Sequence, residues 1–343
     1  MAIKNSGSSL AFSEIEAEFG QNGGRSLGAY RLTQSVGSLS NLPLDSGIPT
    51  SGQIKFSDFY GKKLNVVVDC HSGGREDRKS AKGDKWNNNE VTVIGGFRTK
   101  KEGGSKIIIN VNKKFCSDKS NQINCALKTG SWDSTATVQV DVGSSGEVLG
   151  AGGDGGKGAD GINNNGNAGS PGTSALGIEH NGVIVNIASG GVLRAGFGGG
   201  GGGGGGRQTD KRRDRRAGGG GGGGGAGFPF GTGGQGGVPQ AGTRQANEDI
   251  GSPGGNGTET TGGNGGGGGD NDDQAGGQTG GVGGDNEQSP AAGPSDDSAG
   301  GAAGSNGAAI RETSGVSFTF NTTGGTIEPA SFATASNAAQ NVT

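Results

Sequence analysis

The sequence predicts a protein that is mainly β with little α-helix, in which an ordinary first half leads into a glycine-rich bundle. Glycine makes up 83 of the 343 residues, and 61 of them lie in residues 150–307, far above the roughly 7% of an average protein. β-branched runs of strand length precede this segment. Inside it, glycine recurs every three residues, which is the period of an extended left-handed helix.

Residues 1–61 predict a short helical module that contains an internal repeat. The segment LAFSEI at residues 10–15 matches IKFSDF at residues 54–59. Ser13 and Glu16 fit a capping box, and Ser57 with Asp58 fits a second helix start.

This module has few apolar residues and therefore little material for a core of its own. We expect it to pack against a partner protein. The residues expected to make that contact are Phe12, Phe56, Phe59 and Tyr60.

Residues 62–149 predict a small antiparallel β domain. KLNVVVDC, NEVTVIGG, KIIINVN and ATVQVDV are strand-length runs bounded by Gly, Asn and Asp. The three cysteines, Cys70, Cys116 and Cys125, do not form a disulfide framework. Cys116 and Cys125 flank a polar stretch, so they either close a hairpin or remain free thiols.

Residues 150–310 predict a bundle of polyglycine II helices. A helix of this type makes no internal hydrogen bonds, so its backbone groups must pair with neighbouring helices. We expect the pure glycine runs, 198–206, 218–225 and 265–269, at the centre of the bundle and the mixed runs at its edge. A flexible linker is the alternative. Residues 311–343 are expected to form a C-terminal β or irregular tail.

Insertions of different composition interrupt the glycine scaffold, which is typical of variable binding loops. One insertion, residues 207–217, is strongly basic and lies between the two longest glycine runs. If those runs are antiparallel, the insertion becomes the turn at one end of the bundle, where its cations suit an anionic surface. The candidate binding residues are Arg207, Lys211, Arg212, Arg213, Arg215, Arg216, Phe228, Phe230 and Arg244.

The sequence offers no catalytic set, no metal site and no cofactor motif. Its two histidines, His71 and His180, have no ligand partners at useful spacing. An acidic loop around Asp270 leaves calcium binding open, with a solvated loop as the simpler interpretation. The net charge of −3 argues against a general nucleic-acid binder.

The region that contains VQVDVGSSGEVLGAGGDGGKGADG and then ALGIEHNGVIVNIASGGVLRAGF before a long glycine run resembles a phage protein family. The family is the distal adhesin at the tip of T-even-like phage long tail fibres, and the resemblance covers residues 138–307. In that family a β region leads into a polyglycine sandwich whose hypervariable end loops contact an outer-membrane receptor. The resemblance therefore implies a non-enzymatic adhesin that binds a host outer-membrane protein or a surface polysaccharide.

The first 61 residues resemble instead the short N-terminal modules of structural proteins of tailed phages, including marine ones. This resemblance implies a virion-attachment module that mounts on a tail fibre, tail or baseplate protein, either as a single tip copy on a trimer or as a homotrimer. The chain has no signal peptide or membrane span, so we expect synthesis in the host cytoplasm and assembly into the virion. A purely structural virion protein and, less favoured, a glycine-rich nucleic-acid-binding protein are the alternatives.

Overall fold

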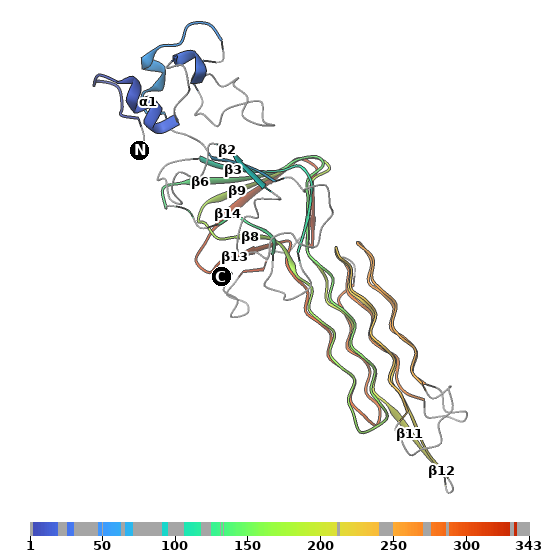
Figure 1. The fold of residues 1–343 in the computed structure, drawn as a ribbon. Coiled ribbons are helices and arrows are strands. Elements are labelled where there is room, and N and C mark those ends of the chain that lie inside the picture. The colour runs from blue at the N-terminus through green and yellow to red at the C-terminus, as the bar shows by residue number, and fades with distance from the viewer. Residues whose placement is uncertain are drawn as a thin grey trace.

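The protein has three parts: a helical N-terminal module, a β domain, and a glycine-rich bundle that extends away from the β domain (Figure 1). It is mainly β and irregular, with very little α-helix. Among the residues described, no helix is long and apolar enough to cross a membrane. The computed structural model describes residues 3–19, 26–30, 47–49, 51–62, 66–70, 91–94, 106–117, 125–130, 132, 134–210, 213–239, 250–269, 276–285, 288–329 and 333–334.

In its described residues, the N-terminal module contains three short helices, α1 (Phe12–Phe19), η1 (Leu27–Tyr30) and η2 (Phe56–Phe59). They enclose a small core of their own, which contains Ile3, Ile15, Tyr30, Ile48 and Phe59. The module therefore buries more of its apolar side chains internally than the sequence indicated.

The internal repeat of this module is also a structural repeat. The Glu14 carboxylate accepts a hydrogen bond from the Ala11 N–H at 2.7 Å, and the Asp58 carboxylate accepts one from the Lys55 N–H, also at 2.7 Å. Each acid thus caps the helix start three residues before it. The expected capping pair of Ser13 and Glu16 is wrong, because α1 begins before Ser13.

The described strands of the β domain form three sheets. Their strand orders are β14-β9-β6-β3-β1-β2, β15-β10-β7-β4 and β16-β13-β8-β5. The bounds are β1 (Val66–Cys70), β2 (Val91–Ile94), β3 (Lys106–Val111), β4 (Lys114–Cys116), β5 (Cys125–Lys128), β6 (Thr137–Val142), β7 (Glu147–Leu149), β8 (Ser174–Ile178), β9 (Val183–Ile187), β10 (Val192–Arg194), β13 (Ile310–Glu312), β14 (Phe318–Thr322), β15 (Thr326–Glu328) and β16 (Ala333–Thr334).

The chain visits these sheets in a fixed order and so forms a β-solenoid. β3, β4 and β5 make one coil, and β6, β7 and β8 the next. β9, β10 and β13 then make a third coil, and β14, β15 and β16 the last. Strands of successive coils pair in parallel. The expectation of an antiparallel domain is therefore wrong: each strand returns to the same sheet one coil later in the same direction, and β1 with β2 is the antiparallel exception.

The interior of the solenoid holds the main hydrophobic core. Side chains of β3 alternate between partly exposed and buried, and Ile107, Ile109 and Val111 point inward with Val138, Val140 and Val142 of β6. Residues 311–343, expected as a separate tail, contribute strands that pair with β9 and β10. The last coil therefore completes the solenoid.

The glycine-rich bundle is inserted into the solenoid between its second and third sheets. Residues 150–173 join β7 to β8, and residues 195–309 join β10 to β13. Because both insertions leave and return at the same corner, the glycine segments run side by side away from the solenoid (Figure 1).

Residues 198–206 lie at the centre of the bundle. The N–H groups of residues 200, 201 and 202 donate to three different neighbouring segments. The N–H of Gly203 then donates to the same segment as the N–H of Gly200. Their acceptors are, in order, the carbonyls of Gly223, Ala291, Asn167 and Gly220, at 2.8, 3.0, 3.0 and 2.8 Å. Residues 218–225 are enclosed in the same way: N–H groups of residues 219–222 donate to Ala159, Gln278, Ser252 and Gly156.

The prediction that pure glycine runs are central is confirmed for these two runs and wrong for residues 265–269. There the exposure repeats with a period of three, and Gly267 is exposed. Glycine at this position leaves open space, since a Cβ on Gly267 would meet no atom within 4 Å.

Candidate functional site

The basic insertion forms a β-hairpin at the end of the bundle that is remote from the solenoid (Figure 1). Its strands are β11 (Gly206–Asp210) and β12 (Arg213–Ala217), which continue the two central glycine runs. The pairing is antiparallel, with Arg207 opposite Arg216 and Asp210 opposite Arg213. The insertion is thus a two-stranded ribbon, and acidic residues interleave with its cations.

An acidic turn supports the base of this hairpin. The Asp297 carboxylate accepts a hydrogen bond from the Arg207 N–H at 2.6 Å. The Ser298 hydroxyl accepts one from the Gly205 N–H at 2.7 Å. These bonds tie residues 296–298 to the root of β11 and direct the ribbon away from the bundle.

The structure places four of the candidate cations on the hairpin strands: Arg207, Arg213, Arg215 and Arg216. Three other candidates, Lys211, Arg212 and Arg244, lie outside the described residues.

Two apolar residues at the same end were not named individually as candidates from the sequence, although Ile250 ends the insertion of residues 241–250 between glycine segments. Val238 is 47% exposed and Ile250 is 44% exposed. They lie on neighbouring antiparallel segments, because the Gly251 N–H donates to the Gly237 carbonyl at 2.9 Å. In the sequence, each of them is an isolated large apolar residue next to glycine, and this pattern could have marked them.

Phe228 and Phe230 lie at the opposite end of the bundle, next to the solenoid. The Lys114 ammonium lies 4.9 Å from the centre of the Phe228 ring, a cation–π distance. Phe230 remains exposed. The phenylalanines and the basic hairpin therefore occupy the two ends of the bundle, so the candidate binding residues do not form one surface.

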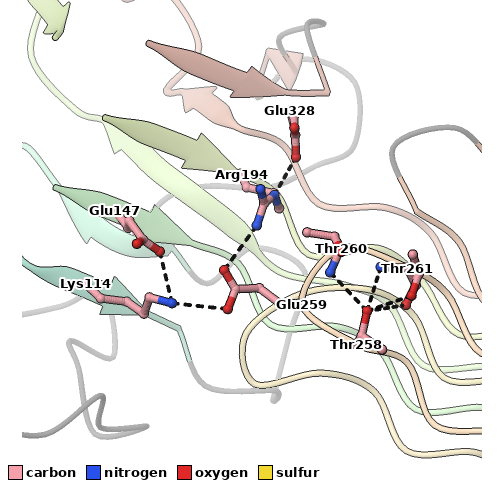
Figure 2. Close-up of polar contacts among 8 residues, drawn as sticks. All are labelled: Lys114, Glu147, Arg194, Thr258, Glu259, Thr260, Thr261 and Glu328. Atoms are coloured by element: carbon pink, nitrogen blue, oxygen red, sulfur yellow. Dashed lines mark hydrogen bonds and ion pairs between the residues drawn. The ribbon is translucent and has the colours of Figure 1, made fainter. Parts of the chain in front are cut away.

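A charged cluster joins this near end of the bundle to the second sheet of the solenoid. Figure 2 shows Glu259, in the turn of residues 258–261, between Lys114 and Arg194, at 3.1 and 3.2 Å. Lys114 also pairs with Glu147 at 3.0 Å, and Arg194 with Glu328. Burial lowers the pKa of Lys114, but its hydrogen bonds with Glu147 and Glu259 outweigh burial and raise that pKa overall.

The four N-terminal candidates have different surroundings. Phe59 is fully buried in the module core, so its expected role in attachment is wrong. Phe56 is 41% exposed, and its ring packs edge-on against Phe12 with the centroids 6.3 Å apart. The Tyr60 hydroxyl donates to the Ser8 carbonyl. Phe56 is thus the most accessible of the four.

The three cysteines and His180 are buried inside the protein. Cys70, Cys116 and Cys125 are buried thiols and not disulfides, and burial raises the pKa of the Cys125 thiol to about 12. The buried His180 ring bonds to the Ala136 carbonyl at 3.0 Å. In the described part of the chain, no cluster of three or more His, Cys, Asp or Glu side chains is suited to hold a metal ion.

Comparisons with known proteins find one matching family. A family model described as phage tail fibre adhesin Gp38 matches residues 86–332, more than half of the chain. Among solved structures, the chain is similar to one in the crystal structure of the gp37-gp38 adhesin tip complex of the bacteriophage S16 long tail fiber. The TM-score is 0.37 and the sequence identity 18%, over 95% of this chain and 99% of that chain. No curated protein matches.

Proposed function

The chain belongs to the phage tail fibre adhesin Gp38 family, and on that premise we propose that it binds its receptor through the loops at the remote end of the glycine-rich bundle. As a member of this family it is an adhesin of the virion, at the receptor-binding tip of the tail fibre, and not an enzyme. The purely structural and nucleic-acid-binding alternatives are therefore set aside.

The position of the basic hairpin carries this proposal. It continues the two central glycine runs beyond the bundle, whereas the near end of the bundle is held against the solenoid by Glu259. The turns at the near end face the body of the protein, so an approaching cell surface meets the remote end first.

We infer further that the segments are polyglycine II helices. The return of hydrogen bonds to the same neighbour every third residue supports this, since that helix has three residues per turn and no internal hydrogen bonds. At about 3.1 Å per residue, the run of residues 198–206 would span roughly 28 Å. Such a rod holds loops apart from the solenoid without a side-chain core.

The chemistry of this end favours a host outer-membrane protein or a surface polysaccharide. Guanidinium groups of the hairpin suit phosphate or carboxylate groups. Val238 and Ile250 add apolar surface that a solvated loop does not need.

We propose also that the N-terminal module attaches the chain to another fibre, tail or baseplate protein, around Phe56. The module lies outside the matched family region, which begins at residue 86, and it lies at the other side of the solenoid from the bundle (Figure 1).

Adsorption of phage to host cells tests the receptor proposal. Replacing Arg213 and Arg215 by Gln should slow adsorption severalfold while particles assemble normally, because two of the charges that meet the receptor are lost. The matched control replaces Lys106 and Lys113 of the solenoid by Gln, which changes the net charge equally, and should adsorb at the wild-type rate. Equal adsorption by both variants would contradict the proposal.

A further inference from the structure

A groove with a row of polar side chains along one wall crosses the corner of the solenoid between its first and second sheets, away from the bundle. Its volume is about 370 Å³, within the size range of small-molecule sites. It is lined by Asn110, Asn112, Asp141, Val142, Gly143, Asn186, Ile187, Ala188, Asn321 and Thr323.

One wall of the groove is a row of amide and carboxyl side chains in strict register. Asn110 of β3 pairs with Asp141 of β6, Asp141 with Asn186 of β9, and Asn186 with Asn321 of β14. These strands lie side by side in the first sheet (Figure 1). Neighbouring strands are roughly 4.8 Å apart, so the row presents a polar group at each such step.

Small residues keep the space beside this row open. Gly143 and Ala188 stack at the corner between Asn112 and Thr323, as the bond from the Ala188 N–H to the Val142 carbonyl at 2.9 Å indicates. A Cβ on Gly143 would overlap the Asn112 amide. Larger side chains at these two positions would fill the groove.

The hydrogen bonds within the groove leave some of its side-chain donors and acceptors available to a ligand. Asn186 donates to Asp141 at 2.7 Å and Asn321 donates to Asn186 at 3.0 Å. Within the described part of the chain, the side-chain amides of Asn110 and Asn112 make no hydrogen bond with other side chains or with backbone groups. Each offers both a donor and an acceptor to a ligand.

The charge of the groove restricts the ligand. Asp141 is the single carboxylate among the described lining residues, and the Gln139 amide donates to both of its oxygens at 2.8 Å. A cation would have to compete with these donors, and an anion would be repelled by the carboxylate. A neutral molecule whose hydroxyl groups both donate and accept fits this set best.

We propose that this groove binds a neutral saccharide. A sugar hydroxyl can donate to the side-chain amide oxygen of Asn110 or Asn112 and accept from the amide nitrogen of either residue. None of the lining residues that the structure describes is aromatic, so the affinity of the site for a single sugar is weak. In an adhesin it would hold neutral glycan of the cell surface independently of the loops at the end of the bundle.

Saturation-transfer NMR on the full chain tests the proposal, with the methyl glycosides of glucose, galactose and mannose as probes and methyl glucuronide as the charged comparison. At least one neutral glycoside should show transfer, and the glucuronide should show none. Transfer should disappear in the double variant Asn110→Ala/Asn112→Ala and in Ala188→Leu, which fills the groove. The matched control Asn163→Ala/Asn164→Ala, in an exposed turn of the bundle, should keep it.

Thermal melting of each variant separates a lost site from a lost fold, since neither Asn110 nor Asn112 supports the described structure through a side-chain hydrogen bond. Absence of transfer to any neutral glycoside, or transfer that persists in both folded groove variants, overturns the proposal. Either result leaves the receptor proposal untouched, because adsorption through the basic hairpin is measured separately.

Discussion

Gly202 and Gly267 both lie in uninterrupted glycine runs, but their surroundings differ. A Cβ on Gly202 would overlap the carbonyl group of Lys157, whereas a Cβ on Gly267 would meet nothing within 4 Å. The need for glycine is therefore steric at Gly202 and absent at Gly267.

Replacing each of these glycines by Ala gives a matched pair. Gly202→Ala should lower the free energy of unfolding by about 3 kcal/mol, because a methyl group is forced between packed backbones. Gly267→Ala should leave it unchanged or raise it by up to about 1 kcal/mol, since alanine restricts the unfolded chain. Chemical denaturation measures both, and equal effects of the two substitutions would contradict close backbone packing.

In the N-terminal module, the sequence predicted the helices correctly but not which of their side chains are exposed. The repeat of residues 10–15 and 54–59 predicted two helix starts, and both exist. Which phenylalanine faces the core depends on contacts across the module, so the sequence alone did not distinguish Phe59 from Phe56.

Substituting these two phenylalanines by Ala separates folding from attachment. Phe59→Ala should destabilise the module by about 3–5 kcal/mol, as for a buried aromatic side chain. Phe56→Ala should keep it folded but yield particles that carry less of this protein. Protease resistance of the module and immunoblots of purified particles provide the two measurements, and normal incorporation of folded Phe56→Ala would rule out Phe56 as the attachment contact.

One turn adds an ionic contact between the bundle and the solenoid, beside the chain connections that join them. Glu259 pairs with both Lys114 and Arg194, while Thr258 and Thr261 close the turn through their own hydrogen bonds. Loss of the Glu259 charge should therefore free the turn from the sheet without unfolding it.

Glu259→Gln should widen the distribution of distances between spin labels at Lys113 on the solenoid and Asn163 at the end of the bundle. The stability lost should be only about 1 kcal/mol, because Glu259 is partly exposed and its ion pairs are screened. Glu312→Gln removes a carboxylate that makes no ion pair in the described part of the chain, and serves as the control. Identical distance distributions in the two variants would show that this cluster does not orient the bundle.

At the scale of the whole molecule, the sequence predicted the glycine bundle better than the β domain. The three-residue period of glycine directly reflects the three-residue pattern of backbone hydrogen bonds. Strand direction has no comparable signature, because a β-branched run looks alike in parallel and antiparallel sheets.

A weak repeat did mark the solenoid, in the segments VDVGSSGEVL, VNIASGGVLR and FNTTGGTIEP. Each spans the corner from the first sheet to the second, with Asp141, Asn186 or Asn321 near its start. Long glycine insertions separate the copies, so the coil was not recognisable by regular spacing.

The central claim is that the end of the bundle remote from the solenoid touches the receptor. Photo-crosslinking on intact particles tests it most directly, with a photoreactive amino acid placed at Arg207 on the hairpin or at Phe230 at the near end. During adsorption, the particles labelled at Arg207 should become crosslinked to a host surface component, and those labelled at Phe230 should not. Crosslinking from Phe230 without crosslinking from Arg207 would contradict the claim.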